Sequence, residues 1–211
     1  MKINEIFKSI QGEGTAAGLP CTFVRTTFCN LRCHWCDTSY AFYDGEEKSV
    51  AAIIAAVDAL SCNLVAITGG EPLLQEEIYP LMTALLDHGY RVLIETSGSI
   101  PIDMVDPRTT VVLDLKCPGS GMSHTIVWEN LAKLKPNDEV KFVIADHNDF
   151  EWAKTVLKQN PTLNDKTILF SPVFDTIGPS QLAEWILKEN LPVRLNMQLH
   201  KLIWAPETRG V

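Results

Sequence analysis

Three of the six cysteines in this chain lie within eight residues, as Cys29-Asn-Leu-Arg-Cys33-His-Trp-Cys36. A structural zinc ion takes four ligands in a closed tetrahedron, and nothing places His34 or Cys21 well as the fourth. A [4Fe–4S] cluster held by three cysteines keeps one iron open to a substrate or cofactor. The spacing therefore favours an iron–sulfur cluster, with zinc and incidental cysteines as the alternatives. The remaining thiols lack such spacing and are predicted to be core or incidental groups: Cys21, Cys62 and Cys117.

A second motif, Thr68-Gly69-Gly70-Glu71-Pro72, follows a short apolar run. Two consecutive glycines let the backbone approach a ligand closely. Their backbone groups, together with the Glu71 carboxylate, could hydrogen-bond a bound amine. The alternative interpretation is a turn that precedes a helix.

The composition is typical of a globular protein, with 46% hydrophobic and 21% charged residues in a chain of 211. That hydrophobic share can fill a core and excludes a disordered chain. The 18 basic and 26 acidic residues give a net charge of −8, which disfavours binding nucleic acid through its phosphates. The N-terminus shows no signal-peptide pattern, and no apolar run is long enough for a membrane span. We therefore expect a cytoplasmic protein in a reducing compartment, with no membrane or direct nucleic-acid partner.

Short β-branched runs alternate with amphipathic stretches, which predicts strands alternating with helices. The predicted strands are Thr22–Thr26, Leu64–Thr68, Arg91–Glu95, Thr110–Leu115, Val140–Ile144, Thr167–Phe170 and Val193–Met197. The predicted helices are Ser49–Leu60, Leu73–His88, Asp149–Gln159, Ser180–Glu189 and, from a weaker pattern, His124–Lys135. Lys2–Phe7 could form an extra strand that pairs with Thr22–Thr26.

Strand followed by helix, repeated about six times, predicts an α/β fold with a parallel sheet and right-handed crossovers. A complete eight-unit barrel typically needs about 250 residues. This chain is shorter, so we expect a partial, incomplete TIM-like β/α barrel that forms a single domain over residues 1–211. Ligands of such folds gather at the carboxyl ends of the strands. The cysteine loop, the Gly-Gly-Glu motif and Thr96-Ser97-Gly98 all follow predicted strands, so we expect them to share one site.

The Cys-x3-Cys-x2-Cys spacing after the first core strand resembles the radical S-adenosylmethionine (SAM) superfamily, and Gly69-Gly70-Glu71 is similar to its GGE segment. Three further motifs make the resemblance specific to one family of this superfamily: Ile10-Gln11-Gly12-Glu13-Gly14, Phe23-Val24-Arg25 and Cys36-Asp37-Thr38. Together they closely resemble the 7-carboxy-7-deazaguanine synthases of queuosine and deazapurine biosynthesis, over nearly the whole chain. The resemblance implies a [4Fe–4S] cluster on Cys29, Cys33 and Cys36, with SAM bound to the fourth iron.

The substrate that this resemblance implies is 6-carboxy-5,6,7,8-tetrahydropterin. Its binding residues would be Ile10, Gln11, Gly12, Glu13, Arg25, Thr68 and His200. The planar guanidinium of Arg25 suits the substrate carboxylate, while Gln11 and Glu13 suit hydrogen bonds to the ring. The alternatives are a surface ion pair between Glu13 and Arg25, a buried strand threonine and a structural histidine.

The resemblance also implies which residues contact SAM. They are Trp35, Cys36, Asp37, Gly70, Glu71, Ser97, Asp114, Leu115, Lys116, Ser171, Pro172, Val173 and Phe174. Ser97 replaces a family asparagine, and Asp114-Leu115 stands where many members carry Ser-Pro. Ser171–Phe174 could instead be a turn, and Trp35 a packing or rim residue.

Thr38 resembles the family's Mg²⁺ ligand. A single hydroxyl is a poor magnesium site, so substrate oxygens and waters would have to complete the octahedron. The metal would therefore depend on the substrate.

The reaction implied by the resemblance begins with one electron passing from the reduced cluster to SAM. The resulting 5′-deoxyadenosyl radical removes a hydrogen from C6 of the pterin, and the ring contracts with loss of ammonia. The family also implies a flavodoxin-like electron donor and a homodimer. Two rivals stay open: another radical SAM enzyme, such as one that activates a partner protein, and a zinc-binding module without activity.

Overall fold

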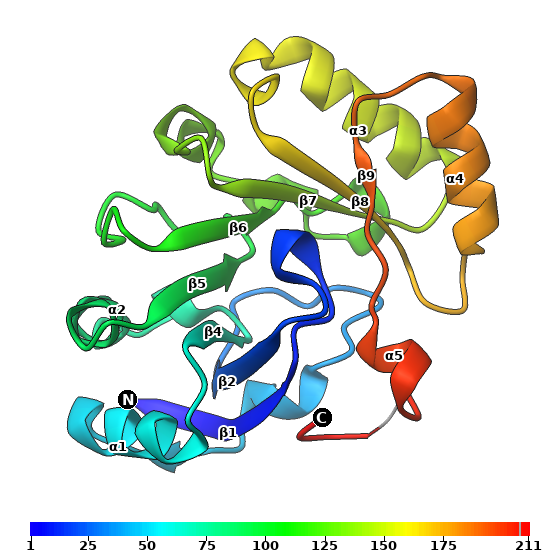
Figure 1. The fold of residues 1–211 in the computed structure, drawn as a ribbon. Helices are drawn as coiled ribbons and strands as arrows, with labels where there is room; N and C mark the ends of the chain where they lie inside the picture. The colour runs from blue at the N-terminus through cyan, green and yellow to red at the C-terminus, as the bar shows by residue number, and fades with distance from the viewer. Residues whose placement is uncertain (207) are drawn as a thin grey trace.

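A computed structural model of the chain describes residues 1–206 and 208–211. Within that part of the chain the strands form one nine-stranded sheet, in the order β3-β1-β2-β4-β5-β6-β7-β8-β9. The strands are β1 (Lys2–Ile10), β2 (Pro20–Thr26), β3 (Glu46–Glu47), β4 (Leu64–Gly69), β5 (Arg91–Thr96), β6 (Thr110–Asp114), β7 (Glu139–Ile144), β8 (Thr167–Pro172) and β9 (Arg194–Leu195). The sheet curves around a central space and does not close (Figure 1). The predicted partial barrel is therefore confirmed.

The sheet is parallel from β2 to β9, as right-handed crossovers require. Only β1 runs antiparallel, between β2 and β3. The extra strand predicted at Lys2–Phe7 is thus confirmed, and it extends to Ile10. The last predicted strand is shorter than Val193–Met197, since β9 covers only Arg194–Leu195.

The helices lie on the outer side of the curved sheet, except the last one, which lies beside its inner opening (Figure 1). They are α1 (Val50–Leu60), α2 (Ile78–Asp87), α3 (His147–Gln159), α4 (Pro179–Lys188) and α5 (His200–Ile203). Side-chain caps fix two of their starts: Ser49 Oγ accepts from Ala52 N, and Asp146 Oδ1 accepts from Asp149 N. No helix in the described ranges is both long and apolar enough to cross a membrane.

The predicted helix at His124–Lys135 is wrong. The segment forms short 3₁₀ turns, at Ser123–Thr125 and Trp128–Lys133. The Asn130 side chain accepts from Ile102 N and donates to Ile100 O, and such bonds to neighbouring backbone compete with a helical ladder. The segment from β5 to β6 also lacks an α-helix, so strand and helix do not alternate through all of the predicted repeats.

The predicted helix Leu73–His88 is interrupted near its start. A 3₁₀ turn covers Pro72–Leu74, and α2 begins at Ile78. Between them, the Gln75 side chain accepts from Lys2 N and donates to Lys2 O and Thr27 O. These bonds to β1 and to the end of β2 hold Gln75 out of the helix.

Alternate side chains along the strands face either the hydrophobic core or the inner space. In β7, Val140, Phe142 and Ile144 belong to the main hydrophobic core, whereas Lys141 and Val143 line the inner space. Side chains with a period of two must face opposite sides of a sheet. The helices cover the outer face, and the inner face lines the cavity. The single domain over residues 1–211 stays a prediction.

Candidate functional site

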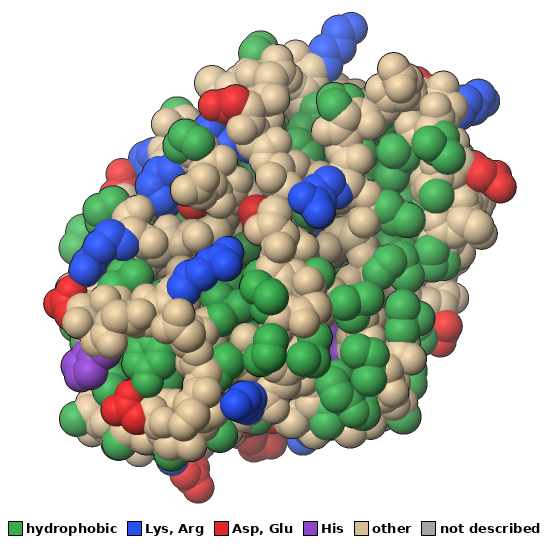
Figure 2. Space-filling model, in the orientation of Figure 1, with side chains coloured by type: hydrophobic (Ala, Val, Ile, Leu, Met, Phe, Trp, Pro, Cys, Tyr) green, Lys and Arg blue, Asp and Glu red, His purple; other side chains and the backbone are tan. Residues whose placement is uncertain are grey.

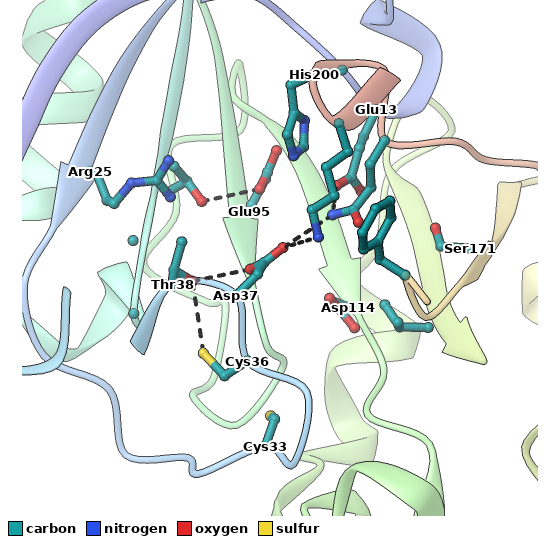
Figure 3. A pocket seen from close by; sticks show the side chains of 18 of the residues that line it. Glu13, Arg25, Cys33, Cys36, Asp37, Thr38, Glu95, Asp114, Ser171 and His200 are labelled. Carbon is teal, nitrogen blue, oxygen red and sulfur yellow. Dashed lines mark hydrogen bonds and ion pairs between the residues drawn. The ribbon is translucent and has the colours of Figure 1, made fainter. Parts of the chain in front are cut away.

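A cavity of about 710 Å³ opens at the carboxyl ends of the parallel strands. This volume lies within the ~300–1,000 Å³ usual for small-molecule sites. The predicted substrate and metal residues all line it: Ile10, Gln11, Gly12, Glu13, Arg25, Thr68, His200, Cys29, Cys33, Cys36 and Thr38. Most of the predicted SAM residues line it as well: Trp35, Cys36, Asp37, Gly70, Ser97, Asp114, Lys116, Ser171, Pro172, Val173 and Phe174. The fold thus brings together segments that are almost the whole chain apart (Figure 3).

The cysteine loop is held by its backbone. Phe28 N donates to Ala41 O at 3.1 Å, Phe28 O accepts from Glu71 N at 2.8 Å, and His34 N donates to Ser120 O at 3.1 Å. The three thiols are half-buried. Burial raises the pKa of Cys33 to about 11 and that of Cys29 above its ordinary value, while the nearby Lys116 ammonium opposes both shifts. Cys29 and Cys33 therefore need a cation such as iron to become thiolates at neutral pH.

The donor set of this loop fits an iron–sulfur cluster. No three His, Cys, Asp or Glu side chains among the described residues converge closely enough to share one metal ion. A [4Fe–4S] cluster does not need such convergence, because each cysteine binds a different iron. Neither candidate for a fourth zinc ligand joins the three thiols: Cys21 is buried in a hydrophobic cluster, and His34 Nδ1 lies 2.9 Å from Gly119 O on the surface. Three thiols would thus leave one iron open.

The end of β4 approaches the cysteine loop very closely at Gly70. A Cβ at this position would collide with the Phe28 carbonyl oxygen and lie 2.7 Å from Cys29 Cβ. Only glycine therefore lets the two predicted cofactor segments meet. The sequence predicted such a close approach, but to a ligand and not to the cysteine loop.

The predicted SAM contact of Glu71 is not supported. Glu71 is fully buried outside the cavity lining. Its carboxylate accepts from Thr96 Oγ1 at 2.8 Å, Ser97 N at 2.7 Å and Leu73 N at 3.1 Å. A buried carboxylate needs such donors, so Glu71 ties the turn after β4 to the turn after β5. These contacts agree with the alternative interpretation of this motif, a turn that precedes a helix.

Leu115 also does not line the cavity. Its side chain is fully buried in the main hydrophobic core, while its neighbours Asp114 and Lys116 line the cavity. The position of this side chain therefore does not support the predicted SAM contact of Leu115. Successive residues of an extended segment point to opposite sides.

Arg25 points into the cavity from β2, between the rings of Phe7 and Tyr40. Its Nε donates to Glu5 Oε1 at 2.7 Å. A guanidinium has five donors, so the Nη side of the fork can still bind a carboxylate. The alternative of an ion pair with Glu13 is wrong, because Glu13 has a different partner.

Glu13 accepts hydrogen bonds from three side chains that sequence reasoning missed. The donors are Lys141 Nζ at 3.0 Å, Asn196 Nδ2 at 3.2 Å and Gln198 Nε2 at 3.0 Å. Burial opposes ionisation, but the Lys141 charge and the hydrogen bonds from Lys141 and Gln198 outweigh it and lower the pKa of Glu13. One signal was available for Lys141: it is the one charged residue of the predicted strand Val140–Ile144.

Glu95 is a further missed group, on the wall beside Gln11 and Thr68. Thr68 Oγ1 donates to Glu95 Oε2 at 3.1 Å, and Gln11 Nε2 donates to Oε1 at 3.4 Å. Burial raises the pKa of Glu95, and Lys141 offsets this only in part. Thr68 is buried in the strand. It lines the cavity, and its hydroxyl donates to the Glu95 carboxylate.

His200 closes the cavity next to the Gln-Gly-Glu-Gly loop. Leu199 N donates to Gly12 O at 3.2 Å, and a Cβ on Gly12 would lie 2.7 Å from His200 Nδ1. Burial lowers the pKa of His200, so its imidazole is neutral at pH 7 and can either donate or accept.

Asp37 and Thr38 lie between the thiols and the C-terminal segment (Figure 3). Thr38 Oγ1 is 3.5 Å from Asp37 Oδ1 and 3.9 Å from Cys36 Sγ. Burial opposes ionisation of Asp37, but Lys201 and Gln198 outweigh it and lower its pKa to about 2. The two side chains therefore offer a hydroxyl and a carboxylate to a hard cation.

Asp114 provides the clearest opening for a ligand on the cofactor wall. Its Oδ2 pairs with Lys116 at 3.0 Å and Lys141 at 3.4 Å. Its Oδ1 is buried and has no hydrogen-bond partner within the described residues. Such an orphaned acceptor beside a cavity fits a hydroxyl or amine donor of a bound molecule, and SAM carries both.

Comparisons with known proteins agree with this geometry. Residues 23–107 match the Radical SAM superfamily. A 7-carboxy-7-deazaguanine synthase of Koribacter versatilis is 46% identical over the whole of both chains. One of Chlorobaculum tepidum is 44% identical, over 100% of this chain and 97% of its own.

Among solved structures, QueE from Escherichia coli superposes with a TM-score of 0.78 at 26% identity, covering 93% of each chain. SuiB of Streptococcus suis shares only the fold, with a TM-score of 0.56 at 15% identity, covering 83% of this chain and 47% of its own. The full-length identity and the match to the Radical SAM superfamily lead to one conclusion: the chain belongs to the 7-carboxy-7-deazaguanine synthase family of radical SAM enzymes.

Proposed function

We propose that the chain converts 6-carboxy-5,6,7,8-tetrahydropterin to 7-carboxy-7-deazaguanine with loss of ammonia. The observation that carries this proposal is that three thiols share one cavity with Arg25, Glu13 and His200. A thiol-bound cofactor is thereby placed beside groups suited to a carboxylate and to ring amines. The names of the curated relatives support the same reaction.

The substrate-side residues would hold the pterin. The free Nη side of Arg25 would bind its carboxylate in a charge-assisted pair. Glu13, Gln11 and the Gly12 backbone would bind the amine and amide groups of the ring, with neutral His200 donating or accepting from the opposite side. Their task is orientation and the exclusion of water.

The cofactor-side residues would hold the cluster and SAM, which when bound supply a 5′-deoxyadenosyl radical for hydrogen abstraction. Cys29, Cys33 and Cys36 would bind the cluster. Asp114 Oδ1 would accept from a hydroxyl or amine of SAM. The rest of the proposed SAM wall comprises Trp35, Asp37, Gly70, Ser97, Lys116, Ser171, Pro172, Val173 and Phe174.

Mg²⁺ would bind at Thr38 in the presence of substrate. Thr38 and the neighbouring Asp37 supply at most two hard oxygen ligands. Mg²⁺ demands six, usually with several waters. We therefore propose that the pterin carboxylate and waters complete the site.

We further propose a flavodoxin-like electron donor and a homodimer. Arg32 supports the donor: it is exposed beside the thiols, and its Nη1 donates to Cys29 O at 2.8 Å, which gives an acidic partner a contact near the cluster. The dimer is supported by hydrophobic side chains that gather on the surface over α4, β9 and α5 (Figure 2). They include Leu187, Leu195, Leu202 and Ile203.

The test is an anaerobic assay of the reconstituted full chain with a chemical reductant, SAM, Mg²⁺ and the tetrahydropterin. We expect 7-carboxy-7-deazaguanine by mass spectrometry, with no product when SAM is omitted. SAM cleavage that the pterin does not stimulate, with no ring-contracted product, would overturn the proposed substrate and return the choice to other radical SAM reactions.

A further inference from the structure

Lys141 occupies a position that the fold alone does not explain. It lies on β7 between Val140 and Phe142, which both belong to the core, and only 9% of its surface is exposed. Burying an ammonium is costly unless it is well paired. Replacing buried ion pairs with apolar residues of similar size is often neutral or even stabilising. A chain selected for stability alone would therefore carry an apolar residue here.

The partners of Lys141 come from both sides of the cavity. Its Nζ lies 3.0 Å from Glu13 Oε2, on the proposed substrate side, and 3.4 Å from Asp114 Oδ2, on the proposed cofactor side. The second contact is built into the sheet, because Asp114 and Lys141 are direct partners in the register of β6 and β7. One ammonium therefore contacts the two carboxylates that the proposed function assigns to different ligands.

The carboxylates on either side depend on this charge. Burial would lower the pKa of Lys141, but Glu13, Asp114 and Glu95 outweigh that effect and raise it well above its ordinary value. Glu13 and Asp114 both keep a pKa below their ordinary values despite burial, with Lys141 among the causes for each. Lys141 is thus the charged link that both carboxylates share.

We propose that Lys141 is a positioning residue that joins the substrate and cofactor subsites, by holding the carboxylates of Glu13 and Asp114 in the orientations in which they meet their ligands. This inference rests on the proposed function. It adds that the two binding events are coupled, and by linkage the coupling is reciprocal. When a ligand binds to Asp114 or Glu13, that carboxylate interacts less strongly with Lys141. The ion pair between Lys141 and the other carboxylate then becomes stronger.

The experiment measures binding rather than turnover. Full-length, cluster-reconstituted protein is kept oxidised and anaerobic, so that no reaction occurs. Equilibrium dialysis then gives the Kd of the tetrahydropterin with and without SAM, and the Kd of SAM, for the wild type and for Lys141→Met. The matched control is Lys154→Met, because Lys154 also pairs with two carboxylates, Glu151 and Glu189, but on the outer helix α3.

For Lys141→Met we expect pterin binding to weaken about 10- to 100-fold, or about 1.4–2.7 kcal/mol. SAM binding should weaken less, and the effect of SAM on pterin binding should fall toward none. Lys141→Arg keeps the charge and should restore most of the pterin affinity, which a purely space-filling role would not predict. Lys154→Met should bind both ligands as the wild type does.

A double-mutant cycle keeps the proposal testable if Lys141→Met folds poorly. Asp114→Asn should change pterin affinity about threefold or more in the wild type and add little in a Lys141→Gln background, where a neutral amide no longer joins the two carboxylates, because contacting residues are non-additive. Equal pterin affinity and unchanged SAM coupling in Lys141→Met, or strictly additive effects in the cycle, would overturn the inference. If the wild type binds SAM but not the pterin, the proposed substrate fails and this inference fails with it.

Discussion

The two walls of the cavity are built in different ways. The cysteine wall is fixed by backbone hydrogen bonds, such as Glu71 N to Phe28 O and His34 N to Ser120 O. The opposite wall is fixed by charged and amide side chains that converge on Glu13. Backbone contacts tolerate most side-chain changes, whereas a buried ion network depends on every partner. In the cysteine wall, only substitutions of the residues that would bind the cluster should therefore have a large effect. In the opposite wall, substitution of any member of the charged network should have an effect.

The sharpest test of the cysteine wall is the loss of one thiol. Any of Cys29→Ala, Cys33→Ala or Cys36→Ala should abolish the cluster and SAM cleavage, because no other thiol lines the cavity within the described chain. Iron and sulfide analysis after anaerobic reconstitution measures the effect. Cys62→Ala, at a buried thiol outside the cavity, should keep the cluster. A full cluster in any of the three variants would contradict the assignment.

The second test asks whether the opposite wall binds substrate through Arg25. Arg25→Ala removes charge-assisted bonds that are typically worth about 1.5–3 kcal/mol, so the half-saturating pterin concentration should rise about 10- to 100-fold with SAM binding little changed. Substrate titration beside a thermal melt separates binding from folding. Arg108→Ala, at a surface ion pair with Asp87 and Asp106, is the control. Normal pterin saturation in Arg25→Ala would reopen the choice of substrate.

The third test asks whether the stability of the cysteine wall depends on the buried carboxylate of Glu71. In Glu71→Gln the amide nitrogen would face one of two backbone donors, Leu73 N in the place of Oε1 or Ser97 N in the place of Oε2. Leaving a buried donor unsatisfied costs about 1–3 kcal/mol, and we expect the free energy of unfolding to fall by that order in urea titrations. Glu76→Gln, at an exposed position, should be neutral. A variant as stable as the wild type would show that the Glu71 carboxylate is not structural.

Thr38 lies where the two walls meet. Thr38→Ala should weaken the stimulation by Mg²⁺ severalfold while the absorption of the cluster stays intact, because only one of about six oxygen ligands is lost. Activity against Mg²⁺ concentration measures this, and Thr155→Ala on the outer face of α3 serves as the control. An unchanged metal dependence would mean that the hydroxyl is only a hydrogen-bonding group of the loop.

The smallest expected effect is the acid dependence of the ion pair between Asp37 and Lys201. The folded pKa of Asp37, about 2, lies below its unfolded value. The pair therefore stabilises the fold above about pH 4, and this contribution is lost as the pH falls toward 2. Because nearly half of the Asp37 side chain is exposed, we expect only ~0–1 kcal/mol. The measurement is the free energy of unfolding, from urea titrations at a series of pH values. Asp37→Asn and Lys201→Met should reduce its fall at acid pH by the same amount. Unequal reductions would mean that other groups cause the acid dependence.

The contiguous parts of this molecule were predictable from the sequence. The cysteine loop, the Gly-Gly-Glu turn, the parallel strands and three of the main helices are each decided within a few residues, by spacing, by alternation or by a cap. Ser49 shows this at α1, because its side chain caps the helix that was predicted to begin at this residue. Three side chains overruled such local patterns through long-range bonds. Gln75 interrupts a helix, Asn130 prevents one, and Glu71 faces Ser97 and not a ligand.

The sequence by itself therefore determined the cofactor chemistry and the family, because thiol spacing and short motifs carry their meaning wherever the chain places them. Only the tertiary structure decided the partners of the charged groups. Arg25 pairs with Glu5 and Glu13 pairs with Lys141, although the sequence suggested a pair between Arg25 and Glu13. Such pairs depend on the register of neighbouring strands, as for Asp114 beside Lys141. That register is set by the packing of the whole sheet, because no segment of the chain contains both partners.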